Sequence, residues 1–133
     1  MTISSNSKIA VTALVDLATH QTSGPVALHA IGQRIKISTS CLERIFESLR
    51  KGGLVNSRRG PSGGYSLKRQ ASQIQLGEIV RVFDVQNFST YATAESRVTQ
   101  DLFAHLNQYA FRLLDNVTLQ SLVCNVDLIN LLV

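Results

Sequence analysis

Nine lysines and arginines lie between residues 34 and 69, against only two glutamates. Their positively charged groups bind phosphate oxygens, and an arginine can also donate two hydrogen bonds to one guanine. Hydroxyl groups suit phosphates too, and a glutamate can accept a hydrogen bond from the amino group of cytosine. The candidate DNA-binding residues are Ser38, Thr39, Ser40, Glu43, Arg44, Arg50, Arg58 and Arg59. These residue types favour the binding of a polyanion, and double-stranded DNA is the expected partner.

The charge of the chain is divided unevenly along its length. The 133 residues carry a formal net charge of +4. Residues 1–83 hold eleven lysines and arginines against four acidic residues, a net of +7, whereas residues 84–133 hold two against five, a net of −3. A basic front part predicts a polyanionic partner for that part only. A run of charges is also what an ordinary solvated surface shows, so composition alone leaves both interpretations open.

Helices and a hairpin are predicted to position these residues. Apolar residues at helical spacing predict helices over residues 8–20 and 28–35, and a third helix that Ser38 or Ser40 caps and that ends at Gly52. Residues 54–55 and 65–67 resemble short strands joined by a glycine-rich loop, and a further helix covers residues 76–83. This order is typical of a winged helix-turn-helix. Its third helix fits the major groove, while Arg58 and Arg59 at the hairpin tip reach the minor groove or the backbone.

A long helix is predicted from about residue 97 to residue 115. It contains an apolar seam with steps of three, four, three and four residues, formed by Phe103, Leu106, Ala110, Leu113 and Val117. This heptad spacing predicts a helix–helix contact in a homodimer, and an internal core stripe is the alternative. The expected fold class is therefore mainly α with a small β-hairpin wing, a winged helix-turn-helix plus a long dimerisation helix.

The expected domain organisation has three parts. They are a winged helix-turn-helix DNA-binding domain in residues 1–84, a linker in residues 85–97, and the dimerisation helix with a C-terminal helix in residues 98–133. The apolar tail, residues 128–133, packs on the partner subunit or belongs to a truncated or partner-binding end. The sequence leaves this open.

Other chemistries find little support. No nucleophile is paired with a base, and the loop 60–64 lacks the lysine and the following serine or threonine of a nucleotide-binding loop. Cys41 is a possible redox site, or a small side chain that fills an apolar niche. Neither Cys41 nor Cys124 has a close cysteine or histidine partner, so we expect no metal site and no cofactor. Because no leader-like or long apolar segment is present, we expect a cytoplasmic protein with no membrane partner.

The chain resembles the iron–sulfur cluster regulator family (IscR-like) of bacterial winged helix-turn-helix transcription regulators. The segments that carry the resemblance are residues 9–14, 24–26, 37–46, 49–55, 59–67 and 116–119. By this resemblance Ser40, Glu43 and Arg59 match family positions that meet DNA, and Arg44 stands where other members often carry glutamine. The resemblance also implies a dimer built by crossing the long helices.

The sequence departs from this family at the cluster ligands. Cluster-binding members place three cysteines in the linker and a histidine near the start of the long helix. Residues 85–97 contain no cysteine and no histidine, and the histidine position falls on Gln100. Because iron–sulfur clusters need thiolate ligands, we predict that no cluster binds. Any effector would then be a small molecule or a protein, as in the family's cysteine-metabolism repressors, which act through a partner enzyme.

The function that the sequence favours is a sequence-specific DNA-binding transcription regulator. We expect a repressor that binds a palindromic operator as a homodimer. The alternative is a winged-helix protein-interaction module without sequence-specific DNA binding. An enzyme is not expected.

Overall fold

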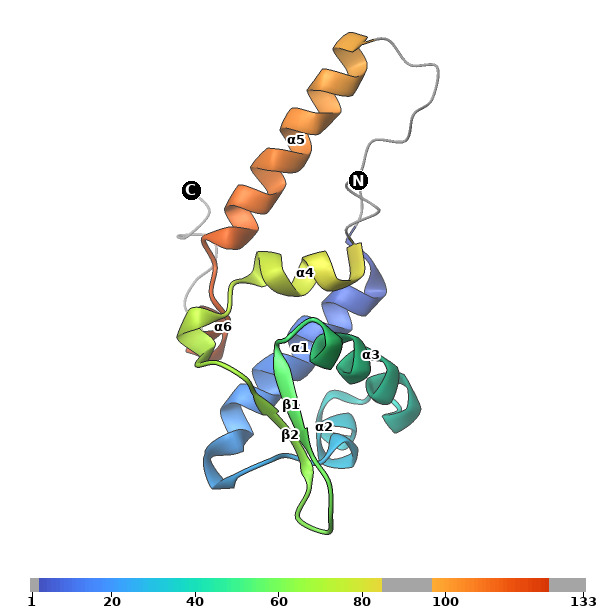
Figure 1. The fold of residues 1–133 in the computed structure, drawn as a ribbon, viewed down its shortest axis with the longest axis vertical. Coiled ribbons are helices and arrows are strands. Elements are labelled where there is room, and N and C mark those ends of the chain that lie inside the picture. The colour runs from blue at the N-terminus through green and yellow to red at the C-terminus, as the bar shows by residue number, and fades with distance from the viewer. Residues whose placement is uncertain (1–2, 85–96, 125–133) are drawn as a thin grey trace.

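The computed structural model describes residues 3–84 and 97–124 (Figure 1). The elements are α1 (Ser5–His20), η1 (Gln21–Ser23), α2 (Leu28–Ile35), α3 (Thr39–Lys51), β1 (Val55–Arg58), β2 (Gly64–Leu67), η2 (Ala71–Gln73), α4 (Leu76–Asp84), α5 (Arg97–Asp115) and α6 (Leu119–Val123). The predicted fold class is confirmed, since the described chain is mainly helical and its one sheet is a two-stranded hairpin. The predictions for residues 85–96 and for the tail 128–133 lie outside the described residues.

Helix α1 is the central element of the core. Its residues Ala10, Ala13, Leu14 and Leu17 are completely buried, because their spacing places them on one face of the helix. The helices α2, α3, α4 and α6 all pack against α1. The buried face of α3 is formed by Leu42, Ile45, Phe46 and Leu49. Burial of this face leaves the opposite, polar face of α3 for other contacts.

A tight turn joins α2 to α3. The Oγ of Ser38 accepts a hydrogen bond of 3.3 Å from the backbone N–H of Cys41, so the earlier of the two predicted caps is the actual one. Lys36 lies in the turn with a left-handed φ of 63°. This conformation costs a residue with a Cβ about 1–2 kcal/mol, which the packing of the two helices must offset.

The strands β1 and β2 form an antiparallel hairpin, the wing. Val55 pairs with Leu67, and Arg58 pairs with Gly64 at the other end. The first strand is longer than the predicted residues 54–55, because its three polar residues also adopt strand geometry while staying exposed. The wing therefore carries Arg58 at the end of a paired strand.

A second backbone pairing ties the wing to the connection between α1 and α2. The N–H of Val26 donates to the carbonyl of Tyr65, and the N–H of Tyr65 donates to the carbonyl of Val26, both at 2.9 Å. Gly64 permits this approach, since a Cβ there would lie 2.3 Å from the Val26 carbonyl oxygen. Strand β2 is thus hydrogen-bonded both to β1 and to the segment between α1 and α2.

Helix α5 extends away from the other helices, at the end of the molecule opposite to the wing (Figure 1). Its C-terminal end is joined to α4 by Arg81, whose Nη1 and Nη2 donate to the two carboxylate oxygens of Asp115 at 2.7 and 2.9 Å. The Arg81 guanidinium also lies 4.2 Å from the centre of the Phe111 ring. No residue of α5 is buried.

After α5 the chain returns to the winged-helix core. The N–H of Leu76 donates to the carbonyl of Val117, and the N–H of Leu119 donates to the carbonyl of Ile74. Leu119 is completely buried, and α6 packs against α1. Val117 is only 4% exposed, so it belongs to the core and not to the apolar seam of α5 as predicted.

Candidate nucleic-acid interface

The polar face of α3 is open to solvent. Ser38, Ser40, Glu43, Arg44 and Arg50 are exposed, and Thr39 is half-buried. Ser40, Glu43 and Arg44 share one side of the helix, because positions three and four apart are neighbours on its surface. With thirteen residues the helix is about 20 Å long. It can therefore present several side chains to successive base pairs of one groove.

The wing presents its two arginines at the tip. Arg58 ends β1 and Arg59 begins the loop, and both side chains are exposed. The loop closes tightly next to them, with a hydrogen bond of 2.9 Å from the Gly63 N–H to the Gly60 carbonyl. A Cβ at residue 63 would lie 2.2 Å from the Arg58 carbonyl oxygen, so the loop requires glycine there.

A hollow of about 560 Å³ lies between α3 and the wing. Its lining residues are Glu47, Arg50, Ser57, Arg58, Arg59, Gly64 and Tyr65. The ring of Phe46 packs edge-on against the ring of Tyr65, with centroids 4.9 Å apart, and so fixes the wing against α3. The fold therefore brings together three of the predicted residues, Arg50, Arg58 and Arg59. The predicted serines and the threonine lie at the opposite, N-terminal end of α3.

Ion pairs divide the basic residues into two groups. The arginine pairs are Arg34 with Asp16, Arg50 with Glu47, Arg69 with Glu78, and Arg81 with Asp115. Within residues 3–84 and 97–124, by contrast, Arg44, Arg58 and Arg59 have no carboxylate partner. Lys36 and Lys68, which are not among the predicted DNA-binding residues, also lack an ion pair within these residues. The unpaired cations are the ones available to a polyanion.

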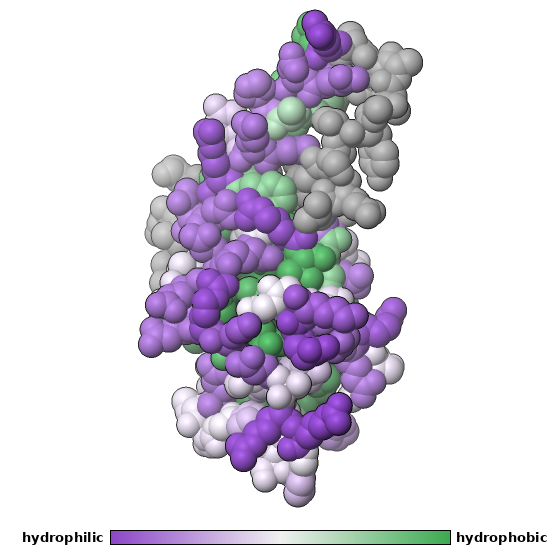
Figure 2. Space-filling model, viewed as in Figure 1, coloured by the Kyte–Doolittle hydropathy of each residue, from purple (hydrophilic) through white to green (hydrophobic). Residues whose placement is uncertain are grey.

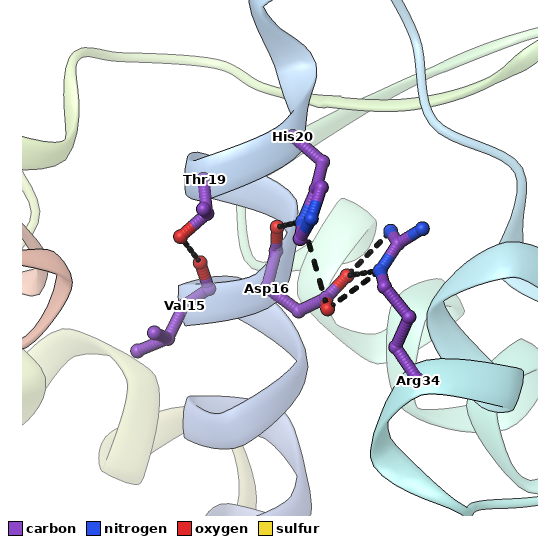
Figure 3. A network of polar contacts seen from close by, with 5 residues as sticks. All are labelled: Val15, Asp16, Thr19, His20 and Arg34. Atoms are coloured by element: carbon purple, nitrogen blue, oxygen red, sulfur yellow. Dashed lines mark hydrogen bonds and ion pairs between the residues drawn. The ribbon is translucent and has the colours of Figure 1, made fainter.

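Arg34 illustrates the paired group (Figure 3). Its Nε donates to Asp16 Oδ2 at 2.9 Å and its Nη2 donates to Oδ1 at 2.7 Å, and the hydrogen bond to Asp16 raises the pKa of Arg34. His20 joins the network through a hydrogen bond of 2.8 Å from Nδ1 to the Asp16 carbonyl oxygen. Figure 3 shows these side chains converging between α1 and α2. The network holds the two helices together, so Arg34 has a structural role.

Arg50 also belongs to the paired group, although it is a predicted DNA-binding residue. Its Nη2 donates to Glu47 Oε1 at 2.6 Å and its Nε donates to Oε2 at 3.0 Å. The Nζ of Lys51 lies 3.8 Å from the same Oε1. The hydrogen bond between Arg50 and Glu47 lowers the pKa of Glu47 and raises the pKa of Arg50. The three-residue spacing on a helix was the signal that could have revealed this pair.

The two cysteines are both free thiols in different surroundings. Cys41 is half-buried in the first turn of α3 and packs against the core. Cys124 is exposed, and its Sγ accepts a hydrogen bond of 3.0 Å from Gln120. The described part of the chain holds no cluster of three or more histidine, cysteine or acidic side chains that suits a metal ion. The possible redox role of Cys41 stays a prediction.

Known proteins are similar to this chain in sequence. The family model Rrf2, described as an iron-dependent transcriptional regulator, matches residues 3–125. The chain belongs to the Rrf2 family. Its curated relatives include the HTH-type transcriptional regulators IscR of Serratia proteamaculans and of Yersinia pestis. Each is 38% identical over 136 aligned residues, which cover 97% of this chain and 83% of the relative. The resemblance to IscR-like regulators is confirmed.

Solved Rrf2-family structures show the same fold. CymR, the global cysteine regulator of B. subtilis, has a TM-score of 0.81 at 30% identity, with 96% of this chain and 99% of that chain covered. The IscR of T. potens has a TM-score of 0.78 at 32% identity, with 96% and 89% covered. These relatives are transcription regulators and not enzymes. The chain is accordingly a DNA-binding transcription regulator of the Rrf2 family. Among its described helices, none has the length and apolar character needed to cross a membrane.

The description of the Rrf2 family as iron-dependent raises the question of an iron–sulfur cluster. Such clusters are held mainly by cysteine thiolates, commonly four of them. This chain has two cysteines, one in the first turn of α3 and one directly after α6. Two thiols on separate elements do not form such a ligand set. The residues of this Rrf2 chain therefore do not fit a cluster.

Proposed function

We propose that this protein is a homodimeric repressor that binds a palindromic operator in a sequence-specific manner. The observation that carries the proposal is the group of exposed, unpaired arginines on two neighbouring elements, with Arg44 on α3 and Arg58 and Arg59 on the wing. Unpaired cations on a groove-sized helix and a β-hairpin complement the phosphate charge and the groove shape of duplex DNA. Figure 2 shows hydrophilic residues on the winged-helix part, beside near-neutral and hydrophobic ones.

The N-terminal end of α3 is proposed to bind phosphate. The hydroxyl groups of Ser38, Thr39 and Ser40 gather there, and the helix N-terminus itself favours negative charge. Ser38 accepts the capping hydrogen bond from the Cys41 N–H through its oxygen, so its O–H can still donate to a phosphate oxygen. These contacts would fix the register of α3 on the duplex without reading its sequence.

The middle of α3 is proposed to read bases. Glu43 and Arg44 are exposed neighbours on the polar face. A carboxylate accepts from the amino group of cytosine, whereas a guanidinium donates twice to guanine. Arg58 and Arg59 on the wing then hold the adjacent backbone or minor groove. Arg50 keeps a place in this interface only where it is released from Glu47.

The homodimer is proposed to form through α5. Six of its large apolar side chains are 45–78% exposed, namely Val98, Leu102, Phe103, Leu106, Tyr109 and Leu113. Val98, Leu102, Leu106, Tyr109 and Leu113 follow steps of four, four, three and four residues, which places them along one face of the helix. Apolar residues of α5 reach the surface among hydrophilic ones (Figure 2). The alternative of an internal core stripe finds no support, because α5 buries none of its residues.

Two copies of α3 related by a two-fold axis would meet two half-sites of a palindrome, about one helical turn or 34 Å apart. A protein seated across a promoter in this way excludes polymerase, which favours repression. We place the protein in the cytoplasm, and its effector is proposed to be a small molecule or a protein and not an iron–sulfur cluster.

Selection of duplexes from a random-sequence pool with the full-length protein tests the proposal. We expect enrichment of an inverted repeat whose half-sites are one helical turn apart. A pool that stays random after repeated rounds would contradict sequence-specific binding. In that case a protein complex that forms independently of salt would favour the second candidate, a winged-helix protein-interaction module. That candidate retains the winged-helix fold but leaves the unpaired wing arginines without a role.

A further inference from the structure

Glu47 is an acidic side chain on the face of α3 that is otherwise suited to DNA. It lines the hollow between α3 and the wing, and its side chain is 43% exposed. Arg58 and Arg59 line the same hollow without a carboxylate partner among the described residues. A phosphate group that enters the hollow toward these arginines therefore also approaches the Glu47 carboxylate, which repels it.

Glu47 also occupies the cations next to it. Both carboxylate oxygens accept hydrogen bonds from the Arg50 guanidinium, and Lys51 lies 3.8 Å from one of them. The same negative charge reaches across the hollow, because burial and then the charge of Glu47 raise the pKa of Tyr65 on β2. Arg50 and Lys51 at the end of α3 thus share the one carboxylate of Glu47. Fewer cations are free to contact phosphates there than a count of the basic residues suggests.

This loss of charge matters most on DNA that is not the operator. Binding to non-operator DNA depends on phosphate contacts alone, and the protein can shift along the duplex until each free cation meets a phosphate. On an operator, base contacts from Glu43 and Arg44 hold the protein at one position along the sequence, so a freed Arg50 has fewer phosphates within its reach. A residue that pairs with Arg50 therefore weakens non-operator binding more than operator binding.

We infer that Glu47 is a specificity-determining residue that contacts no base: it holds the Arg50 guanidinium away from phosphates and so lowers affinity for non-operator DNA. The inference rests on the proposed function. It assigns the two glutamates of α3 different tasks. Glu43 selects a base, whereas Glu47 suppresses binding where no base is recognised.

The variant Glu47→Gln tests the inference, because glutamine keeps the shape and removes the charge. Binding of full-length protein to a mixture of short random-sequence duplexes is measured by fluorescence anisotropy over a salt series. We expect the affinity of the variant to be at least about threefold higher than that of the wild type. The slope of log K against log salt should become steeper by about 0.9 per protomer, the value of one added phosphate contact. Affinity for the selected operator should rise less, so the ratio of operator to random-sequence affinity falls.

Two further variants make the result specific. Glu78→Gln is the matched control, since it removes the same charge and frees an arginine, Arg69, from a pair with the same 2.6 Å contact outside the α3–wing hollow. It should leave affinity and salt slope unchanged. The double variant Glu47→Gln/Arg50→Gln should lose most of the gain on random-sequence DNA, because the freed guanidinium is gone and only the release of Lys51 and the loss of the Glu47 charge remain.

Each other outcome has a definite meaning. An unchanged salt slope in Glu47→Gln overturns the inference, as does an equal gain in Glu78→Gln. A gain that persists undiminished in the double variant overturns the role of Arg50. Failure of the wild type to bind any duplex, even at low salt, would instead overturn the proposed function together with the inference.

Discussion

The winged-helix core and helix α5 expose different kinds of side chain. The core buries its apolar residues around α1 and leaves several cations exposed and unpaired near α3 and the wing. Helix α5 buries none of its residues and exposes six large apolar side chains along its length. Unpaired cations lose little in water and gain from phosphates, whereas an exposed apolar stripe gains only from another apolar surface. The two surfaces therefore suit different partners, DNA for the core and, as we propose, a second copy of the chain for α5.

The largest effect should come from placing a charge in the apolar stripe of α5. Leu106→Glu should convert the dimer to a monomer in sedimentation experiments, because it would bury a carboxylate between two helices. Operator affinity should then fall on the order of 100-fold, since the two half-sites would be bound independently. Gln108→Glu is the matched control, as it adds the same charge at an exposed position of the same helix. A Leu106→Glu protein that remains dimeric would remove α5 from the interface.

The next largest effect concerns the wing. Arg59→Ala should weaken operator binding about tenfold without changing the melting temperature, because Arg59 is exposed and makes no ion pair within the described residues. Arg69→Ala removes an arginine whose charge Glu78 already offsets, and it should change affinity little. Equal affinities of Arg59→Ala and wild type at matched salt would mean that unpaired cations are a poor guide to the DNA interface.

A smaller and more selective effect is expected at Glu43. Glu43→Ala should reduce discrimination at one base pair of each half-site by about 1–3 kcal/mol and leave binding to other sequences nearly unchanged. Anisotropy measurements on operators substituted at each position in turn would locate that base pair. If affinity fell by the same factor on every sequence, Glu43 would not be reading a base.

The smallest effect concerns the joint between the two regions, the Arg81–Asp115 pair. The hydrogen bond with Arg81 lowers the pKa of Asp115 below its reference value of 3.8, so the pair stabilises the fold above that pH and ceases to do so as pH falls through the lowered pKa. The contribution is at most about 1 kcal/mol, because both side chains are more than a third exposed. Melting curves from about pH 6 to about pH 3 should show Asp115→Asn less stable than wild type at pH 6, with the difference shrinking as the pH falls below the reference pKa. A difference that does not depend on pH would mean that the charge of Asp115 is not what joins α4 to α5.

The parts of the fold that local patterns encode were predictable. Helices α2 and α5 begin and end where the apolar spacing predicted, and the capping serine before α3 was among the two candidates. Contacts between distant residues were not predictable in this way. The Val26–Tyr65 pairing joins two segments that show no pattern in common, and Val117 continues the heptad spacing although it packs in the core.

The residue types of the candidate interface were predictable, but which of its cations are paired with a carboxylate was not. Arg50, Arg58 and Arg59 were each predicted to be DNA-binding residues, and the fold brings the three to one hollow. The sequence did not show that Glu47 holds Arg50, because a count of charges does not say which cations are paired. The three-residue helical spacing was the available signal.

Footprinting with hydroxyl radicals on a selected operator tests the central claim most directly. If α3 and the wing bind DNA in two copies, protection should appear in two symmetric blocks about one helical turn apart. Arg59→Ala should weaken protection at the flanks of each block, while the spacing of the blocks stays the same. A single asymmetric block, or no protection at protein concentrations that saturate binding, would contradict the account.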